Sequence, residues 1–374
     1  MDRLAILRTA RQDYAGLLYR LADMPMQRLT KTMFVLFGLL TISCSWAQPS
    51  VAEDSSAVVL LYHRFGENQY PSTNIRIEQL KAQIAQLKSG GYSFMGLTAA
   101  TEALKNDKKF PERTVIFTVD DAYKSFLDVG WPLLKAAGIP VTLFVSTDPV
   151  DEANSNYLNW NDIRALQREG VEIGHHTASH LHMVAAGVET SLKDIRRASA
   201  RFEAELGSVP KLFAYPYGEY SMELAAAVRA EGFEAALAQY SGPVAPWQNQ
   251  FTLPRFPVNE RYGDAERFKL ISQTLALPIG DLIPTGPVLA DAANPPLLGF
   301  TIEEQINGLK AMACYPSHLG KAAELNFVTA RRLEVRFTKP FPKGRNRINC
   351  TLPAGGGRWY WFGQFYIVPG GTLD

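Results

Sequence analysis

The chain has 374 residues, which is long enough for two domains or for one large domain with an appendage. Hydrophobic residues make up 47% of it and charged residues 20%, a composition typical of a globular protein with ample apolar material for a core. The formal net charge of +1 gives no reason to expect nucleic acid as the main partner.

Residues 1–47 have the layout of an N-terminal extension followed by a secretory signal peptide. A basic stretch precedes the apolar run 33–42, and small residues follow it, so cleavage is expected after Ala47. The apolar run is too short for a permanent membrane span. Lipid attachment at Cys44 is a weaker alternative, because Thr41 stands where a lipobox usually has Leu. We therefore expect export to the periplasm or the cell exterior.

Strand-like and helix-like segments alternate between residues 57 and 276. Continuous apolar runs predict buried strands, and apolar residues at helical spacing predict helices between them. The predicted strands are 57–63, 114–121, 141–146, 171–176, 211–218 and 234–240, and the predicted helices are 77–91, 122–138, 160–170, 191–207, 222–232 and 264–277. Repeated units of this kind imply a parallel sheet covered by helices.

Polar and reactive side chains recur at the C-terminal ends of the predicted strands. In a parallel barrel, that edge is where active sites are built, so this distribution favours an enzyme. The residues are His63, Asp120, Asp121, His175, His176 and Tyr217.

The alternating pattern stops at residue 277. Residues 277–296 are rich in Pro, Gly and Ala and predict a linker or a long loop. Strand-like alternation with intervening turn residues then predicts a small β-rich domain over residues 297–374. Cys314 and Cys350 lie in this domain and could form one disulfide in an oxidising compartment.

His176 and His180 are four residues apart, with short side chains between them. A catalytic metal ion takes neutral imidazoles, a third protein ligand and an open position for water. Asp120 and Asp121 can supply one carboxylate ligand and leave the other carboxylate as a base. The alternative is a pair of solvated or capping histidines, but the paired carboxylates at another strand end favour a metal site.

Three segments resemble the first three motifs of the polysaccharide deacetylases, which form carbohydrate esterase family 4 and share the NodB homology domain. They are TVDDAYKSF at 118–126, HTASH at 176–180 and FAYPYGEY at 213–220. The resemblance covers residues 57–275 and is greatest to exported members that begin with a YH strand, such as deacetylases of poly-N-acetylglucosamine. It implies a distorted (β/α) barrel over residues 57–276 that removes N-acetyl groups from an extracellular or cell-wall polysaccharide.

The resemblance also implies a role for each matching residue. A divalent metal ion, most often zinc with cobalt or nickel as alternatives, is expected on Asp121, His176 and His180. Asp120 is expected to be the general base. Pro216 and Tyr217 would line the acetyl pocket, with the backbone N–H of Tyr217 holding the oxyanion.

Two positions depart from the family pattern. Ala122 stands where the first motif usually ends in Gly, and Ala214 stands where the third motif usually has an arginine that orients the base. Arg255 could supply the guanidinium from the next strand end. A surface arginine is an equally good interpretation of Arg255.

The general acid of the family is a histidine in a late LxH motif, and the predicted barrel contains no convincing late copy. The tripeptide LYH at 61–63 has this form on the first strand, and the first and last strands of a closed barrel are neighbours. We therefore favour His63 as the general acid. The alternatives are a histidine that caps a buried strand end and, less favoured, His318.

Several other residues have two interpretations. Trp160 is a candidate wall of the sugar site, with core packing as the alternative. His175 is expected to point to the opposite side from His176, and His182 is expected to support the loop. Residues 331–347 contain seven Lys or Arg against one Glu, which could attract an anionic glycan or could form a solvated strand face.

Two other functions stay open. One is a glycan-binding protein on a degenerate barrel, which the missing arginine of the third motif favours. The other is an amidase for a non-carbohydrate amide, because the motifs describe only the metal site and the acetyl pocket. The expected partner of the enzyme is an N-acetylated polysaccharide.

Overall fold

The computed structural model describes residues 56–371. The predicted signal peptide, its cleavage position and Cys44 lie outside the described residues. Within residues 56–371, no helix combines the length and the hydrophobicity that crossing a membrane requires.

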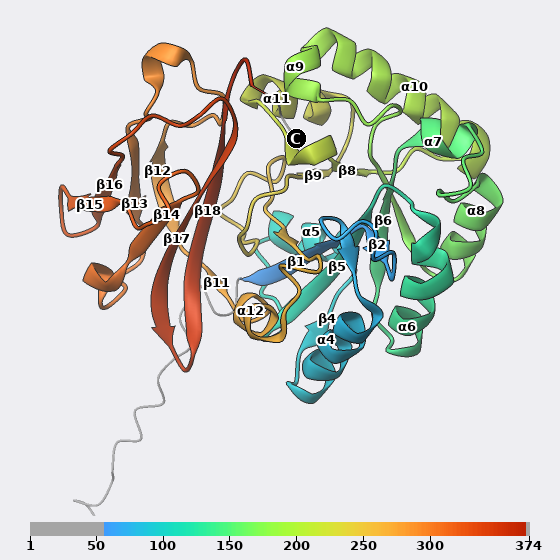
Figure 1. Cartoon of the computed structure of the whole chain (residues 1–374), viewed down its shortest axis with the longest axis horizontal. Coiled ribbons are helices and arrows are strands. Elements are labelled where there is room, and N and C mark those ends of the chain that lie inside the picture. Colours follow the sequence, from blue (N-terminus) through green and yellow to red (C-terminus); the bar gives the residue numbers. More distant parts are fainter. Residues whose placement is uncertain (1–55, 372–374) are drawn as a thin grey trace, which may run out of the picture. The chain divides into compact units, whose positions relative to one another are not determined.

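An eight-stranded sheet forms the centre of the larger part of the molecule (Figure 1). Its strand order is β10-β1-β5-β6-β7-β8-β9, with β4 beside β5, and all of its pairings are parallel. The long strands are buried along their whole length, as continuous apolar runs predict. The strands are β1 (Ala57–Tyr62), β4 (Ser93–Phe94), β5 (Thr114–Asp120), β6 (Val141–Val145), β7 (Glu172–His175), β8 (Leu212–Ala214), β9 (Ala235–Leu237) and β10 (Phe256–Pro257), and β2 (Arg64–Phe65) and β3 (Asn74–Ile75) form a separate parallel pair.

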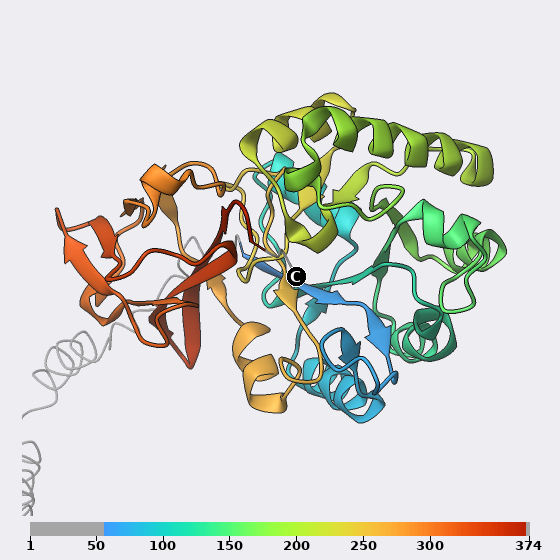
Figure 2. The same ribbon diagram turned by 45° about the horizontal axis from the view of Figure 1, so that its top comes forward.

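The two edges of this sheet are brought together. The N–H of Ala238, directly after β9, donates to the carbonyl of Leu253 at 2.8 Å, and the N–H of Leu253 donates to the carbonyl of Ala236 at 3.0 Å. Leu253 lies just before β10, so the chain passes beside β9 and then pairs with β1. The curled sheet, with helices around it, confirms the predicted distorted (β/α) barrel (Figures 1 and 2).

Helices cover the outer face of the sheet. In α10 (Val188–Leu206), Ile195, Ala198 and Phe202 recur at helical spacing and are fully buried, and Gly207 ends the helix in the left-handed conformation. The other helices are α4 (Ile77–Ser89), α5 (Leu97–Lys105), α6 (Trp131–Ala136), α7 (Thr147–Asp151), α8 (Trp160–Arg168), α9 (Met183–Ala186), α11 (Met222–Ala230) and α12 (Ala265–Ile271), with a π-helical turn at Phe126–Gly130 and 3-10 turns at Pro216–Gly218, Asp291–Ala293 and Leu309–Ala311.

The C-terminal region folds into two four-stranded sheets. One has the order β11-β18-β17-β14 and the other β12-β13-β16-β15. Phe300 and Leu333 from one sheet meet Ile348 and Tyr366 from the other in a single buried cluster, which confirms the predicted β-rich C-terminal region. The strands are β11 (Leu275–Ala276), β12 (Ile279–Ile283), β13 (Leu298–Ile302), β14 (Ala313–Pro316), β15 (Glu324–Phe327), β16 (Arg332–Arg336), β17 (Gly344–Gly355) and β18 (Arg358–Val368).

Residues 277–296, which we expected to be a linker, belong to these sheets instead. β12 pairs antiparallel with β13, and Val288 forms a bridge to Ile367 of β18. β12 is an edge strand, so the prolines at its two ends do not remove a hydrogen bond between neighbouring strands. The composition of the segment therefore suggested a loop although part of it pairs.

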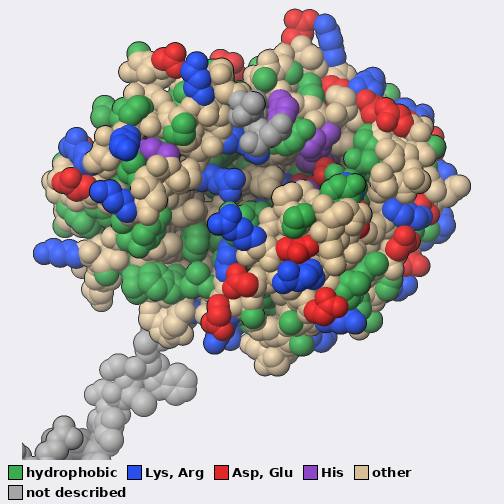
Figure 3. All heavy atoms as spheres, viewed as in Figure 1, with side chains coloured by type: hydrophobic (Ala, Val, Ile, Leu, Met, Phe, Trp, Pro, Cys, Tyr) green, Lys and Arg blue, Asp and Glu red, His purple; other side chains and the backbone are tan. Residues whose placement is uncertain are grey.

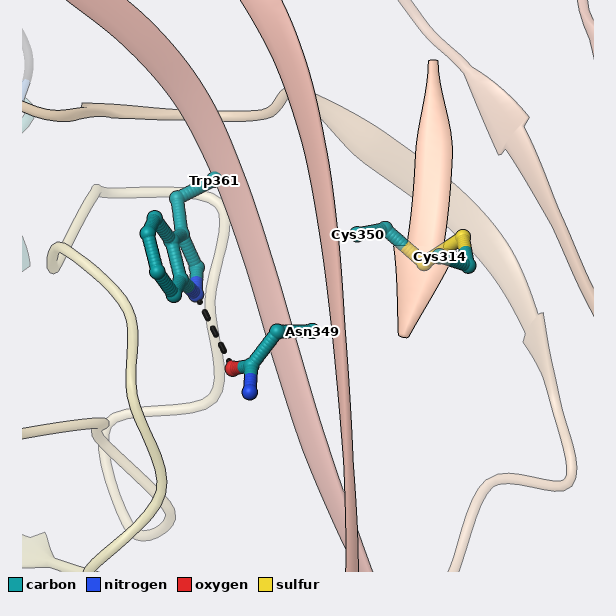
Figure 4. The surroundings of a disulfide bond; sticks show 4 residues. All are labelled: Cys314, Asn349, Cys350 and Trp361. Carbon is teal, nitrogen blue, oxygen red and sulfur yellow. Dashed lines mark hydrogen bonds between the residues drawn. A yellow bond between two sulfur atoms is a disulfide. The ribbon is translucent and has the colours of Figure 1, made fainter. Parts of the chain in front are cut away.

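Cys314 and Cys350 stand opposite each other on β14 and β17 and form a disulfide (Figure 4).

The sheet that contains β17 and β18 also contacts the barrel. Trp361 of β18 donates its indole N–H to Asn349 at 3.1 Å. Its ring packs edge-on against Phe256 of β10, with the ring centroids 5.3 Å apart. Residues of β17 and β18 can therefore reach the barrel.

Candidate active site

β5 delivers two carboxylates to the C-terminal edge of the parallel sheet. Asp120 is the last residue of the strand, and Asp121 and Ala122 follow it with φ of 75° and 58°. Aspartate is one of the few residues besides glycine that adopt positive φ readily. Ala122 is completely buried.

His176 and His180 follow β7 in one loop. The Nδ1 atom of His176 donates to the carbonyl oxygen of Ala214, 2.7 Å away on β8. A backbone acceptor at Nδ1 fixes the tautomer and leaves the lone pair of Nε2 available to a metal ion. This hydrogen bond therefore orients the imidazole of His176 so that its Nε2 atom could bind a metal ion.

Asp194 of α10 holds the loop that presents His180. Its Oδ2 atom accepts hydrogen bonds from the N–H groups of Ala178 and Ser179 at 2.9 and 3.0 Å. Burial raises the pKa of Asp194, but these hydrogen bonds and that from Arg197 lower it by more, and the net pKa lies below its ordinary value. An ionised carboxylate therefore anchors the loop at neutral pH.

The structure brings Asp121, His176 and His180 together as a group that can hold a metal ion. Oδ1 of Asp121 lies 3.5 Å from Nε2 of His176 and 3.2 Å from Nε2 of His180. This oxygen is buried and has no hydrogen-bond partner among residues 56–371. Because an unpaired buried carboxylate oxygen is costly, it fits a cation at this position.

The protonation states of Asp121 and His180 also suit a metal site. Burial raises the pKa of Asp121, but the neighbouring imidazoles lower it by more and hold it well below its ordinary value. Burial lowers the pKa of His180 to about 4, so this imidazole is neutral near pH 7. Two imidazoles and one carboxylate are a ligand set that zinc and similar ions accept.

Arg255 donates hydrogen bonds to Asp120 from both of its terminal nitrogens. Nη1 donates to Oδ1 at 2.7 Å and Nη2 donates to Oδ2 at 2.8 Å. The side chain of Arg255 is 0% exposed, and its Nε donates to the carbonyl of Ala238. Burial raises the pKa of Asp120, but the charge and hydrogen bonds of Arg255, together with the charges of His176 and His63, hold the net pKa below its ordinary value. Arg255 is thus a buried partner of the carboxylate and not a surface arginine.

His63 follows β1 and lines the same cavity as Asp120 and Asp121. β1 lies between β5 and β10, so the residue that follows this strand lies near the two carboxylates at the end of β5. Burial lowers the pKa of His63, and the charges of Asp121 and Asp120 oppose this effect. The structure therefore groups His63 with the predicted site, and His318 lies apart in the C-terminal region, where its Nε2 contacts the Lys339 carbonyl.

The cavity has a volume of about 720 Å³. Its wall contains the predicted residues His63, Asp120, Asp121, His176, His180 and Tyr217. It also contains residues that the sequence did not single out, among them Tyr123, Tyr157, Arg345 and Arg347. Arg345 and Arg347 come from β17, so the C-terminal sheets supply part of the wall; the basic run 331–347 was the signal for them.

The turn Pro216–Gly218 shapes one side of the cavity. Tyr217 has a positive φ of 57°, and its ring stacks on His182 with centroids 3.8 Å apart and meets His180 edge-on. A Cβ atom on Gly218 would come within 2.2 Å of Gln239, so only glycine fits there. Pro216 is a buried residue of the turn and does not line the cavity, so its contact with substrate stays a prediction.

Trp160 packs in the core, which is the second of the two interpretations that the sequence leaves open. Trp160 begins α8 on the same helical face as Ile163 and Leu166, and this face is buried in the core. Its indole N–H donates to Asp151, and its ring packs edge-on against Phe202. Trp160 does not line the cavity, because it lies on the face of α8 that packs into the core.

His175 and His182 lie next to the candidate metal site. His175 points away from His176 into the core, as strand alternation predicts. His175 is fully buried, with Nε2 3.2 Å from the carbonyl oxygen of Ile195 and its ring against Phe213, and burial lowers its pKa to about 3. His182 has its Nδ1 atom 3.1 Å from Oε2 of Glu219 and stacks on Tyr217.

Residues 107–236 match the family model described as polysaccharide deacetylase. This segment is similar to the polysaccharide deacetylases. The matched segment contains Asp120, Asp121, both histidines of the candidate metal site and Tyr217. His63 and Arg255 lie outside it.

Several known proteins are similar to part of this chain. The poly-β-1,6-N-acetyl-D-glucosamine N-deacetylase of Staphylococcus aureus (strain N315) is 24% identical over 235 residues, which cover 56% of this chain and 80% of the relative. The structure of the deacetylase PplD of Streptococcus pyogenes in complex with acetate has a TM-score of 0.53 at 19% identity and covers 57% of this chain and 96% of that chain. The structure of IcaB from Ammonifex degensii has a TM-score of 0.52 at 22% identity, with coverage of 59% and 98%. Part of this chain lies outside each match.

Proposed function

We propose that this protein is an exported, metal-dependent hydrolase that removes N-acetyl groups from the amino sugars of an extracellular or cell-wall polysaccharide. One observation carries the proposal: a three-residue metal-binding group and a separate ionised carboxylate, Asp120, converge in one cavity. A relative named for N-deacetylation of poly-β-1,6-N-acetyl-D-glucosamine supports this reaction and this kind of substrate.

Asp121, His176 and His180 would hold the metal ion. We propose zinc, with cobalt and nickel as alternatives, because two imidazoles and one carboxylate are typical of catalytic zinc sites. When bound, the ion would lower the pKa of a water molecule and polarise the acetyl carbonyl.

The other residues of the cavity would handle the protons and the developing charge. Asp120, oriented by Arg255, would accept a proton from the attacking water. The N–H of Tyr217 would donate to the oxyanion. His63 would give a proton to the amide nitrogen as the C–N bond breaks, so that the products are acetate and a free amine.

The glycan-binding alternative rested on the missing arginine at position 214. Arg255 places a guanidinium on Asp120 from another strand end, at 2.7 and 2.8 Å. A binding protein has no need for a buried, charge-paired carboxylate beside a metal-binding group. This arrangement supports the enzyme.

Acetate release from a panel of defined N-acetylated oligosaccharides tests the proposal. The zinc-loaded protein should release acetate, a chelator should stop the release, and zinc or cobalt should restore it. Binding of the oligosaccharides without any acetate release would support the glycan-binding alternative. Acetate release only from acetamides that are not sugars would support the non-carbohydrate amidase.

A further inference from the structure

Two arginines of the C-terminal sheets line the cavity of the barrel. Arg345 and Arg347 are separated by one residue on β17, so their side chains lie on the same face of the strand. Both line the cavity that contains Asp120, Asp121 and the metal-binding histidines. Figure 3 shows basic side chains beside histidines in the hollow at the centre of this face.

Arg345 has partners in the turn that carries Tyr217. Its Nη1 donates to the carbonyl of Tyr217 at 2.7 Å, and its Nε lies 3.6 Å from Oε1 of Glu219. Glu219 is fully buried and also lies 3.1 Å from Nδ1 of His182. Arg345 therefore positions the turn, and Glu219 offsets its charge.

Arg347 is different. Its backbone is fixed, because its N–H donates to Oγ of Ser317 at 3.0 Å and its carbonyl accepts from the N–H of Ser317 at 2.8 Å. Its guanidinium makes no hydrogen bond or ion pair with any residue between 56 and 371. The only carboxylates in the described wall of the cavity are Asp120, which Arg255 holds, and Asp121, which lies against two imidazoles.

We propose that Arg347 binds a carboxylate of the substrate, so that the preferred polymer is an acidic N-acetylated glycan and not a neutral one. This inference rests on the proposed deacetylase function. A guanidinium on a fixed strand can take a carboxylate with two parallel hydrogen bonds. A positive charge in the wall also disfavours a polymer that carries many free amines.

Three N-acetylglucosamine oligomers of equal length test the inference. One is neutral, one carries lactyl ether carboxylates on alternate sugars, and one alternates with a uronic acid. The full chain, loaded with zinc, should show a kcat/KM for at least one acidic oligomer that exceeds the neutral value on the order of tenfold. Added salt should reduce this preference, because Arg347 is exposed.

Arg347→Met should remove the preference through KM, and Arg347→Lys should restore part of it. Lys339→Met, which removes an exposed charge outside the cavity wall, should keep the preference. Equal kcat/KM values for the three oligomers, or an equal loss on all three in Arg347→Met, would overturn the inference.

A second readout separates this inference from the proposed function. If no oligomer releases acetate, the deacetylase proposal fails. Calorimetric binding of the acidic and neutral oligomers to zinc-loaded wild type and Arg347→Met still tests the arginine: tighter binding of an acidic oligomer that depends on Arg347 supports its role, and equal binding overturns it.

Discussion

Arg255 and Asp120 form a two-point ion pair in the interior of the barrel, with N–O distances of 2.7 and 2.8 Å. The arginine side chain is completely buried, and the carboxylate is nearly so. The residues come from β5 and from the segment before β10, which are separated in the sheet only by β1. This pair fixes both the direction and the charge of the carboxylate that we propose as the general base.

Arg255→Met should therefore damage both stability and activity. It leaves an uncompensated charge in the interior, which should lower the free energy of unfolding by about 3–5 kcal/mol. The pKa of Asp120 should rise and its orientation should be lost, so kcat should fall on the order of 100-fold. Urea unfolding and acetate release measure the two effects. Arg336→Met, an exposed arginine on β16, is the control, and a kcat within twofold of wild type in Arg255→Met would contradict the assigned role.

His63→Gln tests the general acid through the leaving group. Hydrolysis of an N-acetyl amide needs a proton on the departing nitrogen, whereas an aryl acetate ester releases a phenolate that needs none. The variant should lose roughly 100- to 10,000-fold in kcat on the amide and much less on the ester. Parallel assays of both substrates give the ratio. Equal losses on the amide and the ester would assign His63 to another role.

Asp194→Ala should destabilise the loop that presents His180. The substitution leaves the N–H groups of Ala178 and Ser179 without their acceptor, at a cost of about 1–3 kcal/mol. The folded-state pKa of Asp194 lies below its ordinary value, so its contribution is full above that ordinary value and is lost as the pH falls through the folded-state pKa.

Urea unfolding of wild type and Asp194→Ala at several pH values measures this contribution. The difference in free energy of unfolding should be constant near neutral pH and should shrink in acid, below pH of about 4. Asp128→Ala, at an exposed position, serves as the control. A difference that stays the same down to pH 3 would show that Asp194 does not act as a carboxylate.

The disulfide between Cys314 and Cys350 should stabilise the C-terminal sheets. It closes a loop with a sequence separation of 36 residues, for which the loss of chain entropy in the unfolded state amounts to roughly 3–4 kcal/mol. The double variant Cys314→Ser/Cys350→Ser should therefore unfold at a lower urea concentration than oxidised wild type. Reduced wild type should behave like the variant, and identical midpoints for oxidised and reduced protein would refute this contribution.

The convergence of Asp121, His176 and His180 could be predicted from the sequence because these residues follow strands of a parallel sheet. Asp121 follows β5 and His176 follows β7, and the C-terminal ends of parallel strands meet at one edge. Arg255 could not be assigned in the same way. Its burial depends on the passage of its segment beside β9 and on the pairing of β10 with β1, which are long-range features that a local pattern does not contain.

Contacts between distant segments also decide what the sequence leaves open. Trp160 has the same spacing to Ile163 and Leu166 whether that face meets the core or a ligand, and only the packing of α8 decides between them. Arg345 and Arg347 belong to the basic run 331–347, whose sequence suggests either attraction of an anionic glycan or a solvated strand face but does not locate the run at the cavity. Their place in the cavity follows from the contact of β17 and β18 with the barrel.

Asp120→Asn tests the central claim most directly, with metal content and acetate release measured on the same zinc-loaded sample. We predict a metal stoichiometry equal to that of wild type and a kcat reduced by at least about 100-fold, because the general base is lost while Asp121, His176 and His180 are retained. Asp121→Asn should instead lose metal. A folded Asp120→Asn protein that contains zinc and releases acetate at the wild-type rate would contradict the account.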